Sequence, residues 1–81
     1  MDTLSPALGQ TIRRYRLAAG LSQEALAERA DLHRNHVGFL ERGERSPTVD
    51  VLARIGNALG APAWVLLKEA QDAAESTFGG S

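Results

Sequence analysis

Apolar side chains recur every three or four residues near the start of the chain, which is the spacing of an amphipathic helix. This first stripe consists of Leu8, Ile12, Tyr15 and Ala19. Ser5 followed by Pro6 is a typical helix opening, because serine caps free N–H groups and proline at the first helical position has no N–H to satisfy. Since Gly20 is a typical end, we expect a helix from Ser5 to about Ala19.

Two shorter amphipathic segments follow, separated by the turn Asp31-Leu32-His33. Ser22 is expected to cap the second helix, which runs through Arg29. Its inward side chains are Leu26, Ala27 and Ala30. The third helix is expected over about residues 33–42, with Gly43 closing it. Two short helices around a tight turn predict a helix-turn-helix, and the remaining chain forms its scaffold.

The second half of the chain predicts two further helices. Thr48 caps the fourth helix and Gly60 ends it. Its apolar stripe is Val49, Leu52, Ile55, Ala58 and Leu59. Pro62 opens the fifth helix, and Val65 and Leu66 turn toward the core. Without any useful β-alternation, the chain is expected to be an all-α bundle of five helices.

The fifth helix can continue beyond Leu67. The residues that fall on one stripe of it are Ala63, Leu67, Ala70 and Ala74. Residues 78–81 are expected to fray. The pattern therefore divides the chain into a helix-turn-helix domain at residues 1–68 and a helical extension with a flexible tail at residues 69–81.

Composition places the chain among small soluble domains. Its 81 residues suffice for one domain with a small core, and cysteine is absent. The longest apolar run, residues 61–67, is far shorter than the roughly 20 residues that span a bilayer. The first ten residues lack the basic start and apolar stretch of a secretory signal. We therefore expect a cytoplasmic protein without a membrane partner.

Charge alone does not indicate nucleic-acid binding, since the formal net charge is −1. Arginines nevertheless outnumber acidic residues between residues 13 and 45, whereas acids predominate after residue 68. A weakly polarised molecule of this kind must rely on specific contacts more than on bulk attraction.

Several motifs occur together in the run LSQEALAERADLHRNHVGFLERGERSPTVDVLARIGNALGAPAWVLL. They are Arg-x-x-x-Gly-Leu-Ser-Gln at 16–23, Leu-Ala at 26–27, Glu-Arg-Gly at 41–43, Pro47, and Ala-Leu-Gly at 58–60. In this order and spacing they resemble the lambda-repressor-like, or xenobiotic-response-element (XRE), helix-turn-helix regulators. The chain is similar to small stand-alone members such as restriction–modification controller proteins. The resemblance implies a five-helix fold and sequence-specific DNA binding.

Two positions depart from the family pattern. Asp31 stands where the family usually has glycine, in a turn that typically needs a left-handed backbone, which aspartate tolerates at some cost. His33 stands where the family usually has a small hydroxyl residue. The turn is expected to survive with slight strain, and the cap of the third helix is in doubt.

The outward face of the third helix carries groups that can read base edges. Val37 and Leu40 point to the core, whereas Arg34, Gly38 and Arg42 lie roughly opposite, with Asn35 on the flank. Arginine can pair with guanine and asparagine with adenine in the major groove. Gly38 is unfavourable inside a helix. It indicates close approach to DNA, and the alternative is chance or tight packing.

Two flanking side chains have alternative roles. His36 could donate to a phosphate or pack against the second helix. Phe39 could contact a thymine methyl group or shelter against the loop at residues 43–47, and we favour the loop.

Other residues are candidates for phosphate binding. Ser22 and Gln23 open the second helix, where free N–H groups favour an anion, and the resemblance implies that Gln23 also braces a side chain of the third helix. Arg42 and Arg45 flank the loop after the third helix, His33 lies at the start of that helix, and either Arg13 or Arg14 could assist from the first helix.

The resemblance further implies a partly buried ion pair between Arg16 and Glu41, with a structural role. His33 and His36 could share a helix face, but only Asp31 is nearby as a further metal ligand. There is also no zinc-protease, phosphate-loop or nucleophile motif. We expect no metal, no cofactor and no enzymatic activity.

Modules of this size usually bind DNA as twofold dimers. Trp64 is the only tryptophan, and together with Leu67 and Ala70 it is a candidate for the homodimer interface. The alternative is that Trp64 packs inside its own domain.

Two functions follow from these patterns. The first is a homodimeric transcriptional regulator, such as a repressor, that binds double-stranded DNA at an inverted repeat and could act on its own promoter. The alternative is a protein-interaction module, such as the antitoxin of a toxin–antitoxin pair, that uses its C-terminal segment. We expect no small-molecule effector, because the sequence shows no separate ligand-binding domain.

Overall fold

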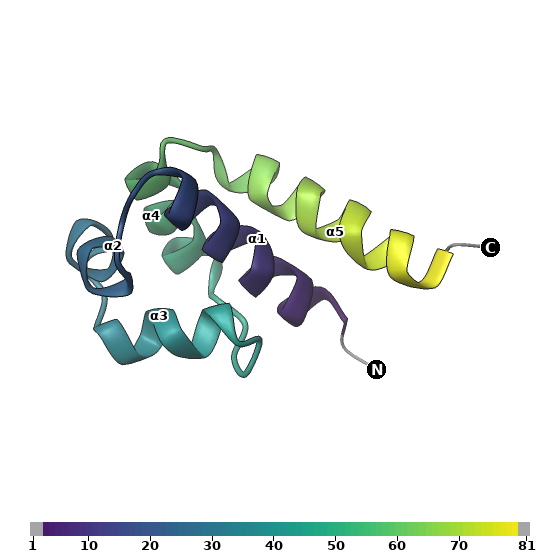
Figure 1. The fold of residues 1–81 in the computed structure, drawn as a ribbon, viewed down its shortest axis with the longest axis horizontal. Helices are drawn as coiled ribbons and strands as arrows, with labels where there is room; N and C mark the ends of the chain where they lie inside the picture. The colour runs from purple at the N-terminus through teal and green to yellow at the C-terminus, as the bar shows by residue number, and fades with distance from the viewer. Residues whose placement is uncertain (1–2, 80–81) are drawn as a thin grey trace.

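The computed structural model describes the backbone of residues 3–79 and the side chains of residues 3–76. Five helices follow one another in this part of the chain, without any strand (Figure 1). They are α1 (Leu4–Ala18), α2 (Gln23–Ala30), α3 (Arg34–Glu41), α4 (Val49–Leu59) and α5 (Ala63–Gly79). The predicted all-α, five-helix fold is confirmed. None of the described helices is long and apolar enough to cross a membrane.

Most of the helix boundaries follow the predicted caps. The hydroxyls of Ser22 and Thr48 accept hydrogen bonds from backbone N–H groups in the first turns of α2 and α4. Gly60 ends α4 with a φ of 73°, in the left-handed region that glycine adopts without strain. These boundaries depend on neighbouring residues, and local sequence therefore predicts them well.

The start of α1 was predicted wrongly. The helix begins at Leu4, and its N-cap residue, Thr3, makes no side-chain capping hydrogen bond. Ser5 is a buried residue inside the first turn, and its hydroxyl forms a hydrogen bond with the hydroxyl of Ser46. Ser5 therefore ties α1 to the loop between α3 and α4 instead of capping the helix.

All five helices contribute side chains to the core. Its largest fully buried apolar side chains are Ile12, Leu26, Leu40, Ile55, Leu66 and Val37. Gly9 brings α1 close to the end of α3, because a Cβ atom there would lie 2.3 Å from the carbonyl oxygen of Leu40. Val49 does not belong to the α4 stripe as predicted, since 87% of its surface is exposed.

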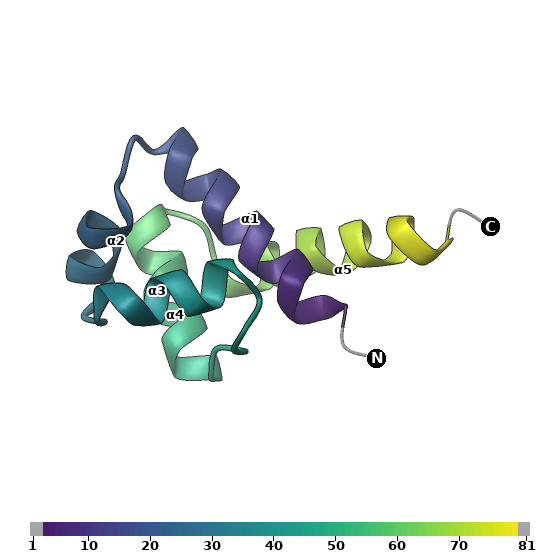
Figure 2. The same ribbon diagram turned by 60° about the horizontal axis from the view of Figure 1, so that its bottom comes forward.

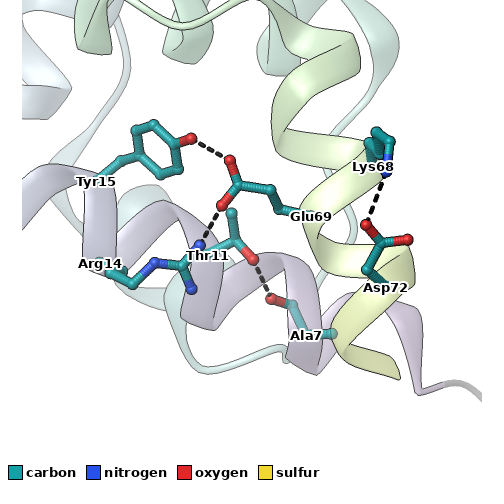
Figure 3. Close-up of polar contacts among 7 residues, drawn as sticks. All are labelled: Ala7, Thr11, Arg14, Tyr15, Lys68, Glu69 and Asp72. Carbon is teal, nitrogen blue, oxygen red and sulfur yellow. Dashed lines mark hydrogen bonds and ion pairs between the residues drawn. The ribbon is translucent and has the colours of Figure 1, made fainter. Parts of the chain in front are cut away.

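Helix α5 lies alongside α1 and continues past the N-terminal end of α1 (Figures 1 and 2). Glu69 accepts hydrogen bonds from the guanidinium of Arg14 and the hydroxyl of Tyr15, as Figure 3 shows. The hydrogen bond to Glu69 is the main cause that raises the pKa of Tyr15 above its usual value. On the same helix, Lys68 pairs with Asp72 at 2.9 Å.

The segment after residue 68 is thus continuous with α5 and is held to α1. Fraying was expected from Phe78 onward. The backbone of Phe78 and Gly79 is instead helical, and residues 80–81 lie outside the described residues.

Candidate nucleic-acid interface

The outward face of α3 and the first residue of α2 enclose a polar hollow of about 230 Å³. Its lining consists of Gln23, Arg34, Asn35, Gly38, Phe39 and Arg42. Val37, Leu40 and Glu41 are buried on the opposite side of α3. Arg34 and Asn35, by contrast, are exposed. The residues with base-reading chemistry therefore share one accessible surface, as the helical spacing predicts.

His33 supplies the cap of α3 that the family's usual hydroxyl residue would supply. Its Nδ1 atom accepts a hydrogen bond from the backbone N–H of Asn35 at 3.1 Å. An accepting Nδ1 carries no proton, which places the proton of the neutral ring on Nε2. The exposed ring can thus cap the helix and still offer an N–H donor. Replacing the hydroxyl with histidine preserves the helix start.

A buried ion pair joins α1 to the end of α3. Arg16 Nε donates to Glu41 Oε2 at 2.6 Å, and Arg16 Nη2 donates to Glu41 Oε1 at 3.0 Å. Only 8% and 3% of the two side chains are exposed. Hydrogen bonding to Glu41 raises the pKa of Arg16. This is the pair that the resemblance implied.

Gln23 extends this pair to α2. Its Nε2 donates to Glu41 Oε1 at 3.1 Å, while Arg16 Nη1 donates to the carbonyl of Leu21 at 2.8 Å. The carboxylate of Glu41, the last residue of α3, therefore binds both α1 and the beginning of α2. Gln23 braces a side chain of α3, as implied, and also lines the polar hollow.

The arginines of this surface form ion pairs that are exposed to solvent. Arg34 lies 3.9 Å from Glu24, and Arg42 Nε donates to Glu44 at 2.7 Å; all four side chains are about half exposed or more. Arg13 lines a neighbouring hollow with Gln23 and Arg42. Arg14 instead pairs with Glu69. Of the two α1 arginines that the sequence left open, Arg13 is the one beside this surface.

Gly38 is buried because the side chain of Arg42 covers it. A Cβ atom at Gly38 would lie 3.0 Å from Arg42 Nη1. The guanidinium of Arg42 therefore lies close against Gly38 in this structure. Of the other two flanking residues, His36 is half-buried and is not among the residues lining the hollow, and Phe39 contacts arginines.

The turn between α2 and α3 depends on a residue that the sequence analysis did not identify. Asp31 has the expected left-handed backbone, with a φ of 57°. Arg54 of α4 donates from Nη1 to the carbonyl oxygens of Asp31 at 2.9 Å and Ala30 at 3.3 Å. A cation is favourable at a helix C-terminus. Arg54 thus supports the left-handed turn from outside the helix-turn-helix.

Comparison with known proteins identifies this arrangement. The helix-turn-helix family profile matches residues 12–63, which is more than half of the chain. The chain belongs to the XRE-type helix-turn-helix family of transcription regulators. Control protein C.BamHI from Bacillus amyloliquefaciens is 43% identical over 53 residues, which cover 64% of this chain and 65% of that protein. The match thus spans slightly less than two thirds of the relative's length.

Two solved structures share the fold. The clp gene regulator ClgR from Corynebacterium glutamicum superposes with a TM-score of 0.89 at 29% identity, covering 96% of this chain and 83% of that chain. The restriction-modification controller protein C.AhdI from Aeromonas hydrophila superposes with a TM-score of 0.74 at 38% identity, covering 75% and 92%. Both likenesses extend beyond the turn to most of the bundle.

The three residues predicted for the homodimer interface differ in their exposure to solvent. Trp64 is 66% exposed, whereas Ala70 is fully buried. The prediction of Ala70 at a dimer interface is wrong, because its side chain belongs to the chain's own core. Leu67 is half-buried and lines an apolar hollow of about 280 Å³ together with the exposed Val49.

No group of three or more His, Cys, Asp or Glu side chains is placed to hold a metal ion among the residues that the structure describes. The polar hollow on the outward face of α3 is lined by arginine, asparagine and glutamine side chains. These are hydrogen-bond donors suited to base edges and phosphates.

Proposed function

We propose that this chain is a sequence-specific DNA-binding transcription regulator that places α3 in the major groove. The observation that carries the proposal is the polar hollow at the joint of α2 and α3. There, exposed base-reading side chains lie beside a helix N-terminus that is fixed to them through Glu41. In helix-turn-helix proteins the second helix reads bases and the first crosses the backbone.

Base reading is assigned to the first turn of α3. Arg34 can pair with O6 and N7 of guanine, and Asn35 with N6 and N7 of adenine. The Arg34–Glu24 contact is 3.9 Å long and both side chains are mostly exposed. A weak, solvated pair of this kind is easily exchanged for a base edge.

Phosphate contacts are assigned to the rim of the hollow. The start of α2, with Ser22 and Gln23, offers backbone N–H groups to an anion. Arg42, Arg45 and Arg13 supply cations around the reading face. His33 can add its Nε2 proton. Such contacts fix the position of the protein without reading the sequence.

A homodimer is proposed on an inverted-repeat site. One recognition helix reads only a few base pairs, and two half-sites about 34–36 Å apart match a twofold dimer. Trp64 and Leu67 lie one turn apart on α5, and Leu67 lines the apolar hollow that also contains Val49. Exposed apolar groups around such a hollow suit a second copy of the chain.

Selection of bound duplexes from a random DNA pool tests the proposal. We expect enrichment of an inverted repeat, and a complex whose native mass corresponds to two chains per duplex. Val49→Asp should reduce the complex to single chains bound weakly to half-sites, whereas the change Ala53→Asp at another exposed position of α4 serves as the matched control. A pool that remains random after repeated selection would refute DNA reading.

A further inference from the structure

The aromatic ring of Phe39 lies at the edge of the polar hollow and is half-buried. Two guanidiniums lie over it. The Cζ atom of Arg42 is 5.3 Å from the ring centroid, and the Cζ atom of Arg45 is 4.8 Å from it. Both distances are within the roughly 6 Å at which an aromatic face attracts a cation. One ring thus gathers two positive charges at the C-terminal end of α3.

The surroundings of the two guanidiniums differ. Arg42 is also held by Glu44, and its guanidinium lies against Gly38, where an added Cβ atom would be 3.0 Å from Nη1. Within the described part of the chain no carboxylate pairs with Arg45, so the ring of Phe39 is its fixed neighbour. Free arginine side chains have many rotamers, and ordering them before binding reduces the entropy lost on binding.

We propose that Phe39 is a positioning residue for DNA binding, whose ring orders Arg42 and Arg45 toward the phosphate backbone beside the reading face. The inference rests on the proposed function. It assigns to Phe39 a role that is independent of base sequence, and the thymine-methyl contact considered from the sequence is thereby replaced. Gly38 takes part because, without a side chain, it lets the Arg42 guanidinium lie close against it.

The two roles of Phe39 predict different binding behaviour. A residue that orders phosphate-binding arginines contributes equally on all sequences, and its loss reduces the salt dependence of binding. A residue that contacts a thymine methyl contributes only on the selected site, and its loss leaves the salt dependence unchanged. Affinity measured over a range of salt concentrations on two duplexes therefore separates them.

The test uses Phe39→Leu, which retains apolar bulk without the aromatic face, and Phe39→Tyr as the aromatic control. Dissociation constants are measured against salt for the selected duplex and for an unrelated one. Phe39→Leu should weaken both by roughly threefold to tenfold and lower the slope of log affinity against log salt by about 1. Phe39→Tyr should retain the affinity and the slope. A loss confined to the selected duplex, or no loss, would overturn the inference.

A double-mutant cycle keeps the result independent of small changes in folding. Arg45→Gln should weaken binding in the wild-type background and much less in the Phe39→Leu background, because the ring no longer orders that side chain. Arg13→Gln should weaken binding equally in both, since the guanidiniums over the Phe39 ring belong to Arg42 and Arg45 and not to Arg13. Equal losses for Arg45→Gln in both backgrounds would also overturn the inference. If the wild-type protein bound neither duplex, the proposed function itself would fail.

Discussion

Arginine–glutamate pairs of two kinds lie on the two sides of α3 and the residues that follow it. On the inner side, Glu41 holds Arg16 in a two-point pair that is more than 90% buried. On the outer side, Arg34 faces Glu24 at 3.9 Å and Arg42 binds Glu44 with both side chains about half exposed. The residue types are the same, but only the inner pair is removed from water.

The difference in burial gives the two kinds of pair different roles. A buried pair is costly to break, because removing one charge leaves the other without a partner in the core. An exposed pair contributes little to stability and can be exchanged for a phosphate or a base edge. The inner pair therefore fixes the position of α3, and the outer pairs leave its reading face available.

The largest effect is expected from Glu41→Gln. The change leaves the guanidinium of Arg16 buried without a countercharge, and Gln23 loses its carboxylate acceptor. The free energy of unfolding should fall by about 3–5 kcal/mol, as measured by chemical denaturation. Glu24→Gln is the matched change on the outer side and should cost less than about 1 kcal/mol. Similar costs for both would abolish the distinction between the two sides.

An intermediate effect is expected at the turn that joins the two helices. Arg54→Ala removes the donor that binds the carbonyl oxygens of Asp31 and Ala30, and should lower stability by about 1.5–3 kcal/mol. Asp31→Gly should raise it by up to about 1 kcal/mol, because glycine adopts the left-handed conformation without strain. If Arg54→Ala left stability unchanged in thermal unfolding, the turn would hold without support from α4.

The contact between α1 and α5 should respond to alkaline pH. Tyr15, the only tyrosine, has a raised pKa in the folded chain because its hydroxyl donates to Glu69. This contribution to stability is fully present below pH about 10, the unfolded value, and is lost as pH rises through the folded pKa. Tyr15→Phe should reduce the alkaline decline without abolishing it, since binding to Asp72 also raises the pKa of Lys68.

Tyrosinate absorbance during a pH titration reports the ionisation of Tyr15 directly. In the folded protein the transition should occur at higher pH than in the unfolded chain. Coincident transitions would show that the hydrogen bond to Glu69 does not hold the proton in solution.

The smallest effect on stability is expected from Glu44→Gln. Its exposed pair with Arg42 should contribute at most about 0.5 kcal/mol to stability. DNA affinity should rise on all sequences by up to roughly fivefold, since two charges about 4 Å apart interact by about 1 kcal/mol in water. A fall in affinity would indicate that Glu44 is needed to orient Arg42, and that the outer pairs are not simply exchangeable.

Local patterns predicted the helices and most of their ends because amphipathic spacing and caps act between residues near in sequence. The predictions that were wrong concern residues whose environment is set by parts of the chain distant in sequence. Ser5 bonds to Ser46, 41 residues away, and Ala70 is buried in the core instead of facing a second chain. Val49 satisfies helical spacing, but no other helix covers it.

The candidate site shows the same division. The outward face of α3 followed from helical spacing and from the family motifs. The support of Arg54 for the turn and the two guanidiniums over Phe39 depend on how loops and helices meet, which no single segment specifies. The burial of Ala70 also affects the antitoxin alternative, because deleting the C-terminal segment to test for a protein partner would remove a core side chain as well.

Arg34→Ala tests the central claim most directly, because it removes an outer-side arginine whose loss should not affect the fold. Its unfolding curve and its affinity for the selected duplex and for single-base variants are compared with those of the wild type. We expect unchanged stability, weaker binding of the selected site, and discrimination at one base pair reduced by about 1–3 kcal/mol. Unchanged affinity and unchanged sequence preference would contradict the assignment of this face of α3 to the major groove.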